Sequence, residues 1–225
     1  MFSLLSRRLL ITTILGAFSF TAFAESGRED YDLDDDGLIE INDLADLDEI
    51  RNNLDGTSLY GTSQGCPEAG CNGFELTTDL DFDTNADGVM DENDAYWNDG
   101  AGWEPIGTYS GNNSSVSFSG MFDGNGFVIR NLYINRSSSQ YQGLFGGAIG
   151  AQLCNLILTG PLTSVTGQQY VGVLAGTLVG SEVTDVYASG SARSQSNNIG
   201  GIAGDAPDTS LLRVQSAAAV EGNYG

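Results

Sequence analysis

Two twelve-residue segments, 32–43 and 83–94, carry the spacing of oxygen-donating side chains that a calcium loop requires. Side-chain oxygens stand at loop positions 1, 3, 5, 9 and 12, glycine stands at position 6, and position 7 is apolar and needs only its carbonyl. Calcium takes about six to eight oxygens on a sharply turned backbone, which glycine permits. The predicted ligands are Asp32, Asp34, Asp36, Leu38, Glu40 and Asp43 in the first loop, and Asp83, Asn85, Asp87, Val89, Asp91 and Asp94 in the second.

The alternative reading of both segments is a pair of solvated acidic turns, because Asp, Asn and Gly also favour Asx turns. Both loops end in Asp, at Asp43 and Asp94, where helix-loop-helix calcium sensors carry a bidentate Glu. They are therefore similar to the loops of dockerins and extracellular calcium modules. Extracellular modules bind with dissociation constants of about 0.1 to 1 mM. We expect two structural Ca2+ ions rather than a signalling role.

Residues 1–24 have the features of a secretory signal peptide. Arg7 and Arg8 precede an apolar run, and Ala22-Phe23-Ala24 stands before Glu25. The run is too short and wrongly flanked for a membrane anchor, and no later segment predicts a membrane span. We expect cleavage near Ala24-Glu25 and a protein that is secreted or held at the outer surface of the cell envelope.

The chain is strongly acidic, with a net charge of −22, eight arginines and neither lysine nor histidine. An acidic surface repels nucleic acid and makes divalent cations natural partners, so nucleic-acid binding is excluded. The lack of histidine removes Ser-His-Asp triads, HExxH zinc sites and histidine general bases. Chemistry based on pairs of carboxylates stays open.

Cys66 and Cys71 lie in a loop rich in turn-forming residues. In an exported chain this arrangement predicts a local disulfide, and the alternative is two free thiols. Cys154 is flanked by Leu153 and by the apolar run 156–158. We expect it to be a small buried apolar residue rather than a reactive thiol.

Residues 25–102 are predicted to form an N-terminal cap that contains one short helix, the two calcium loops and the disulfide loop. The helix follows from apolar residues at a spacing of three to four, and Asp55-Gly56 ends it. Residues 74–77 and 80–82 are then predicted to form a short strand pair that enters the second calcium loop. The apolar stripe of the helix is Leu44, Leu47, Ile50 and Leu54.

Residues 103–225 are predicted to form a parallel β-helix, because a glycine-rich block recurs in them. Gly143, Gly172 and Gly200 open successive blocks at steps of 29 and 28 residues, and each block is followed by a second apolar run. A period of this length with short strands indicates a solenoid, because one unit cannot bury its own apolar face. Tyr224-Gly225 resembles the start of another unit, so we expect the chain to be truncated at its C-terminal end.

The segments 118–134 and 143–146 resemble the bacterial surface proteins that carry GLUG repeats. Segments typical of that architecture occur in the same order: a strand and helix, an ELTTDLDF strand, a W-x-P-I-G segment and an FSG-x-FDGNG turn. The resemblance implies a secreted or surface β-helix in which the repeats are scaffold. The later blocks have drifted from the Gly-Leu-Val/Phe-Gly pattern, although small and apolar residues are kept where coils stack.

The sequence therefore predicts a mainly β, calcium-stabilised solenoid that acts as a non-catalytic adhesion or interaction scaffold at the bacterial surface. Its partner is expected to be an unidentified surface ligand, such as a glycan or a host or neighbouring cell surface.

Two alternatives rest on weaker signals. A polysaccharide-degrading β-helix enzyme would need a carboxylate cluster, and the candidates are Asp79, Asp81, Asp83 and Asp123. A carbohydrate-binding module would use aromatic platforms, with Trp97 and Trp103 as the stacking residues beside Tyr96 and Tyr109. The simpler interpretation of these aromatic residues is that they fill the core of the cap.

Overall fold

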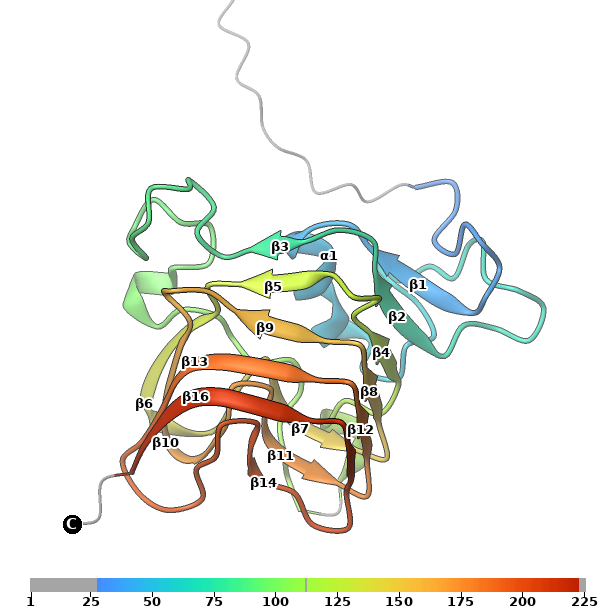
Figure 1. The fold of residues 1–225 in the computed structure, drawn as a ribbon. Helices are drawn as coiled ribbons and strands as arrows, with labels where there is room; N and C mark the ends of the chain where they lie inside the picture. Colours follow the sequence, from blue (N-terminus) through green and yellow to red (C-terminus); the bar gives the residue numbers. More distant parts are fainter. Residues whose placement is uncertain (1–27, 112, 223–225) are drawn as a thin grey trace, which may run out of the picture.

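The protein folds as a parallel β-solenoid of about three turns with one short α-helix (Figure 1). The structure, a computed structural model, describes residues 28–111 and 113–222. The predicted mainly β solenoid is confirmed. The predicted signal peptide at 1–24 and the incomplete unit predicted at Tyr224-Gly225 lie outside the described residues.

Three sheets form the walls of the solenoid, and their strands pair in parallel. The first sheet contains, in spatial order, β1 (Leu38–Ile41), β2 (Gly73–Leu76), β4 (Met121–Asp123), β8 (Gln152–Cys154), β12 (Glu182–Thr184) and β15 (Ser210–Leu212). The second contains β3 (Leu80–Asp81), β5 (Val128–Arg130), β9 (Ile157–Thr159), β13 (Tyr187–Ser194), β10 (Ser164–Val171) and β6 (Tyr133–Gln142), with β16 (Gln215–Gly222) paired to β13. The third contains β7 (Phe145–Ile149), β11 (Ala175–Val179) and β14 (Ala203–Asp205).

The glycine-rich blocks lead into the third sheet, where Phe145, Ala175 and Ala203 stand in register. The glycines are needed because the coils approach closely. A Cβ added at Gly172 would lie 2.5 Å from the Cα of Ala203, and one at Gly143 would lie 2.7 Å from the Cα of Ala175. The glycines recur in the sequence because each lies where two successive coils approach closely.

The core is a set of ladders that run along the solenoid axis. In the first sheet, Phe74, Phe122, Leu153 and Val183 stand in register and all are buried. Because side chains alternate across a strand, the residues next to them face outward. The outward ladder beside them contains Glu40, Glu75, Asp123, Cys154, Thr184 and Leu212.

The region predicted as a cap contributes strands to the same walls as the repeats. β1 and β2 continue the first sheet and β3 continues the second, so residue 102 marks no break in either sheet (Figure 1). The predicted helix is present as α1 (Leu44–Glu49) and a 3-10 turn at Ile50–Asn52, and it ends before Leu54, the last residue of the predicted stripe. Leu47 and Ile50 are fully buried. None of the helices in the described chain has the length and hydropathy of a bilayer-spanning segment.

Candidate metal centres

The first acidic loop is held in shape by hydrogen bonds from its own backbone. Asp32 accepts bonds from the N–H of Asp36 at 3.1 Å and of Gly37 at 2.9 Å, and Asp36 accepts from the N–H of Leu38 at 2.8 Å. Gly37, at φ 88°, supplies the turn that position 6 requires. The result is that carboxylate oxygens of Asp32, Asp34 and Asp36 lie within 4.8 Å of one another.

The second acidic loop, whose sequence differs, repeats these bonds at the same positions. Asp83 accepts from the N–H of Asp87 at 3.2 Å and of Gly88 at 2.9 Å, and Asp87 accepts from the N–H of Val89 at 2.9 Å. Asn85 occupies position 3, and its Oδ1 accepts from the N–H of Asp87 at 3.0 Å. The spacing of Asp, Asn and Gly therefore determines the loop conformation in both places.

The two loops are closed by carboxylates from different loop positions. Glu40, at position 9, accepts a bond from the N–H of Leu33 at 2.5 Å, whereas Asp94, at position 12, accepts from the N–H of Thr84 at 2.7 Å. Leu33 and Thr84 both stand at position 2, so Glu40 and Asp94 each close their loop by accepting the N–H of the same loop position. Asp91, at position 9 of the second loop, instead accepts from Asn93.

Asp43, predicted as the closing ligand of the first loop, makes a different contact in the structure. The first loop runs directly into β1, and an extended strand carries the chain forward about 3.3 Å per residue. Asp43 lies beyond the end of that strand, where its Oδ1 caps α1 by accepting bonds from the N–H groups of Ala45 and Asp46. The second loop has no strand after it and turns back, which brings Asp94 to its start.

The first loop contains a buried carboxylate oxygen without a partner. Glu40 is only 4% exposed, and its Oε2 has no hydrogen-bond partner among the described residues. Burial raises the pKa of both Glu40 and Asp32 above their ordinary values. Buried charges in proteins are paired or coordinate metals. The clustered oxygens of Asp32, Asp34 and Asp36 fit a hard divalent cation, and Glu40 follows them in the same loop.

The carbonyl donors predicted at position 7 are Leu38 and Val89. Leu38 is the first residue of β1, and Val89 lies on the second loop, where its side chain is 54% exposed. Both residues immediately follow the glycine turn, as a carbonyl ligand at this position requires.

The predicted disulfide is present and supports the first loop. Cys66 and Cys71 are bonded, and the N–H of Tyr31 bonds the carbonyl of Gln64 at 2.9 Å. The disulfide loop is therefore attached to the residue directly before Asp32. Cys154 is a free thiol, half-buried on β8, and burial raises its pKa to about 12.

One acidic residue beside the first loop lies outside the twelve-residue calcium-loop pattern. Glu75 on β2 stands in register with Glu40 on one side and Asp123 on the other, and it is 8% exposed. Burial, followed by the charges of Asp36 and Asp34, raises the pKa of Glu75 to about 7. Its alternation with two apolar neighbours predicts a strand, but only the register shows that it faces Glu40.

Trp103 is not a glycan platform, so this prediction is wrong. Its side chain is fully buried, its indole N–H donates to the carbonyl of Leu144 at 3.3 Å, and Arg51 covers its ring at 4.5 Å. Trp97 is half-buried and stacks on Tyr133, with ring centroids 5.4 Å apart. The aromatic residues of this region mainly pack on one another.

The carboxylates considered for catalysis lie in two places. Asp79, Asp81 and Asp83 line one open groove of about 600 Å³ beside Asp43, whereas Asp123 lies on β4 in the first sheet. Several of these groups have structural partners. Asp79 pairs with Arg130 at 3.2 Å, Asp81 accepts from Asn131 at 2.8 Å, and Asp123 accepts from Asn155 at 2.9 Å.

Two curated proteins are similar to this chain in sequence. Halomucin from Haloquadratum walsbyi is 34% identical over 179 residues, which are 80% of this chain but 2% of halomucin. A putative Gly-rich membrane protein from Evansella cellulosilytica is 34% identical over 139 residues, which are 60% of this chain and 13% of that protein. The chain thus spans a small fraction of either relative. No protein-family model and no solved structure matches it.

Proposed function

We propose that this chain is an exported, calcium-stabilised β-solenoid that acts as a non-catalytic scaffold for adhesion or interaction at the cell surface. The observation that carries the proposal is the shared conformation of the two acidic loops. Two different sequences form the same backbone hydrogen bonds, and in the first loop carboxylate oxygens of Asp32, Asp34 and Asp36 lie within 4.8 Å of one another. In the first loop Oε2 of Glu40 is also buried without a hydrogen-bond partner among the described residues.

The scaffold role is supported by the way the coils are built. Each coil packs on its neighbours through ladders of apolar and small residues, which is the construction of solenoids that present extended surfaces. The likeness to a putative Gly-rich membrane protein supports a place at the cell envelope. The resemblance to proteins with GLUG repeats points the same way, and the predicted signal peptide provides the export route.

The expected role of the cation is to stabilise the first coils. With a dissociation constant near 0.1 mM and millimolar calcium in the medium, mass action adds about 1 to 1.5 kcal/mol per site. Without the ion the clustered carboxylates repel one another, so the loops should loosen before the apolar core does.

Calorimetric titration with CaCl2, paired with thermal melts in calcium and in chelator, tests the calcium part of the proposal. We expect two sites near 0.1 mM or tighter and a lower melting temperature in chelator. Asp34→Asn and Asp87→Asn should each weaken one site, while Asp208→Asn, at an exposed turn of the last coil, serves as the matched control. Absence of binding in the unaltered protein would reduce both loops to acidic turns.

Surface display is tested separately on intact cells. A tagged chain should be labelled by antibody on unpermeabilised cells or recovered from the medium, and a variant that lacks residues 1–24 should remain inside. Equal intracellular retention of both forms would contradict the export part of the proposal.

A further inference from the structure

A stripe of carboxylates crosses the first strands of the first sheet. Glu40 of β1 stands opposite Glu75 of β2, and Glu75 stands opposite Asp123 of β4. Neighbouring strands lie about 4.8 Å apart, so these side chains project from adjacent rungs on the same outward face. Like charges directly opposite each other in a sheet are destabilising.

The two glutamates of this stripe are buried although they face outward. Glu40 is 4% exposed and Glu75 is 8% exposed. The same ladder continues as Cys154, Thr184 and Leu212 at greater distance along the sheet. Carboxylates therefore occupy the ladder on the strands nearest the first acidic loop and are replaced farther away.

Protein groups balance the charge of the stripe only in part, because the charge of Arg28 acts on Glu40 without a direct bond to its carboxylate. The guanidinium of Arg28 bonds the backbone carbonyl of Glu40 and the carboxylate of Asp46, not the carboxylates of the stripe. Glu75 accepts one bond at Oε2, from the neutral side chain of Asn125 at 2.9 Å. Among the described residues, Oε2 of Glu40 has no partner.

We infer that the cation of the first loop is shared between neighbouring strands of the solenoid, with Glu75 of β2 acting beside Glu40 of β1. The ligand class is a divalent cation, and calcium is the probe. This inference rests on the proposed calcium binding and adds a carboxylate that lies more than thirty residues from the loop formula. The first site would then be formed by residues of both β1 and β2, and not by residues 32–43 alone.

The test uses protein in which Asp83→Asn and Asp87→Asn silence the second loop, so that titration with CaCl2 reports the first loop. In this background Glu75→Gln should weaken calcium binding about 10- to 100-fold. The same change should raise the melting temperature in chelator, because it removes a buried charge, and lower it in calcium. A reversal of sign between the two media is not expected of a merely structural residue.

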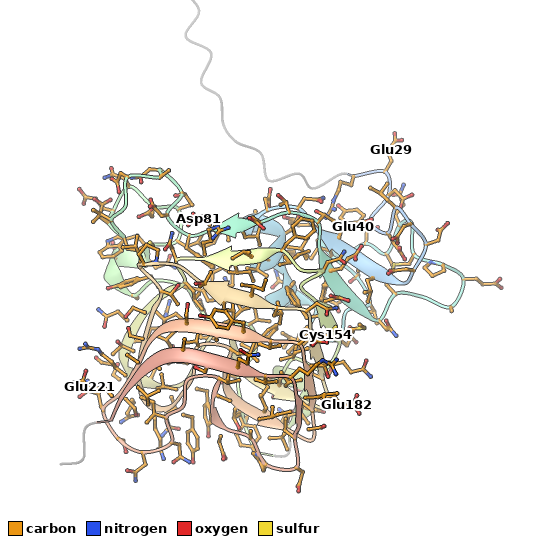
Figure 2. The ribbon with its side chains drawn as sticks, viewed as in Figure 1. Glu29, Glu40, Asp81, Cys154, Glu182 and Glu221 are labelled. Carbon is orange, nitrogen blue, oxygen red and sulfur yellow. A yellow bond between two sulfur atoms is a disulfide. The ribbon has the colours of Figure 1, made fainter. Side chains whose placement is uncertain are left out.

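Glu182→Gln is the matched control, because Glu182 is an exposed glutamate on β12 of the same sheet. Figure 2 labels it well away from Glu40. This control should change neither affinity nor the two melting temperatures. Glu75→Asp, which keeps the charge on a shorter stem, should recover part of the affinity that Glu75→Gln loses.

The outcomes separate the inference from the proposed function. Unchanged affinity in Glu75→Gln, with binding lost in Glu40→Gln, would overturn the shared site and leave a calcium loop confined to residues 32–43. Absence of calcium binding in the background protein would overturn the shared site, and its absence in the unaltered protein as well would overturn the proposed calcium binding. Weakened binding with the reversal of sign would support the shared site.

Discussion

The Sγ of Cys71 lies 3.5 Å from the Oδ2 of Asp32, so a disulfide borders the carboxylate at the first position of the first loop. Asp32 is fully buried, and its Oδ2 also accepts the N–H of Gly37. The disulfide loop therefore covers one side of the proposed cation site. This contact links the covalent crosslink to the acidic loop.

Replacement of both cysteines by serine should consequently act on the first loop and not on the second. We expect the Cys66→Ser/Cys71→Ser variant to lose about 2 kcal/mol of unfolding free energy, by the loop-closure estimate for so short a loop. Calcium affinity should fall at the first site only, which calorimetry on variants with one loop silenced can measure. Equal losses at both sites would show that the disulfide stabilises the fold in general.

Glu40→Gln and Asp43→Ala should separate the roles of the acidic residues at loop positions 9 and 12. Glu40→Gln should abolish calcium binding at the first site, because Glu40 closes the loop. Asp43→Ala should leave that affinity unchanged and cost about 1 kcal/mol of stability, since it removes the cap of α1. Calorimetry and urea unfolding give the two readouts, and a loss of affinity in Asp43→Ala would contradict the assignment.

Cys154 should be unreactive in the folded protein. Burial, followed by the charge of Asp123, raises the pKa of its thiol to about 12, so at pH 8 the thiol stays protonated. Because the thiolate is the nucleophile, alkylation by iodoacetamide should be at least about 100-fold slower in native than in denatured protein. Mass spectrometry under non-reducing conditions follows the reaction at this one free thiol. Similar rates in both states would show that Asp123 and the sheet do not suppress the thiolate.

Gly172→Ala should destabilise the solenoid by about 1 to 3 kcal/mol or more, because the new Cβ would lie 2.5 Å from backbone atoms of the next coil. Gly180→Ala is the matched control. Nothing lies within 4 Å of a Cβ at that position, and the cost there should be about 1 kcal/mol from its φ of 55° alone. Thermal melts compare the two variants. A larger loss in Gly180→Ala would show that backbone strain, not coil contact, dominates.

Features that depend on short-range spacing could be predicted from the sequence. The turn of each acidic loop follows from Asp, Asn and Gly within six residues, and the Cys66–Cys71 disulfide closes a loop of similar size. The solenoid follows from the glycine-rich block, which recurs at steps of 29 and 28 residues. These features need no knowledge of which strands become neighbours.

Features that depend on the path of the chain could not be predicted in this way. Whether Glu40 or Asp43 closes the first loop depends on the strand that follows it, since the same spacing closes at position 12 in the second loop. Glu75 faces Glu40 only through the register of β1 and β2. The burial of Trp103 depends on Arg51 and on the chain around Leu144, which lie far from it in sequence.

The parallel, in-register stacking of the coils has a mechanical consequence. Each strand bonds mainly to the strands directly beside it. Force applied along the axis should therefore separate one pair of neighbouring strands at a time, starting from an end of the solenoid. The proposed cation sites and the disulfide lie at the N-terminal end, where β1 and β2 form the first rung of the first sheet. The calcium content of the surrounding medium would then set the pulling force at which that end begins to unravel.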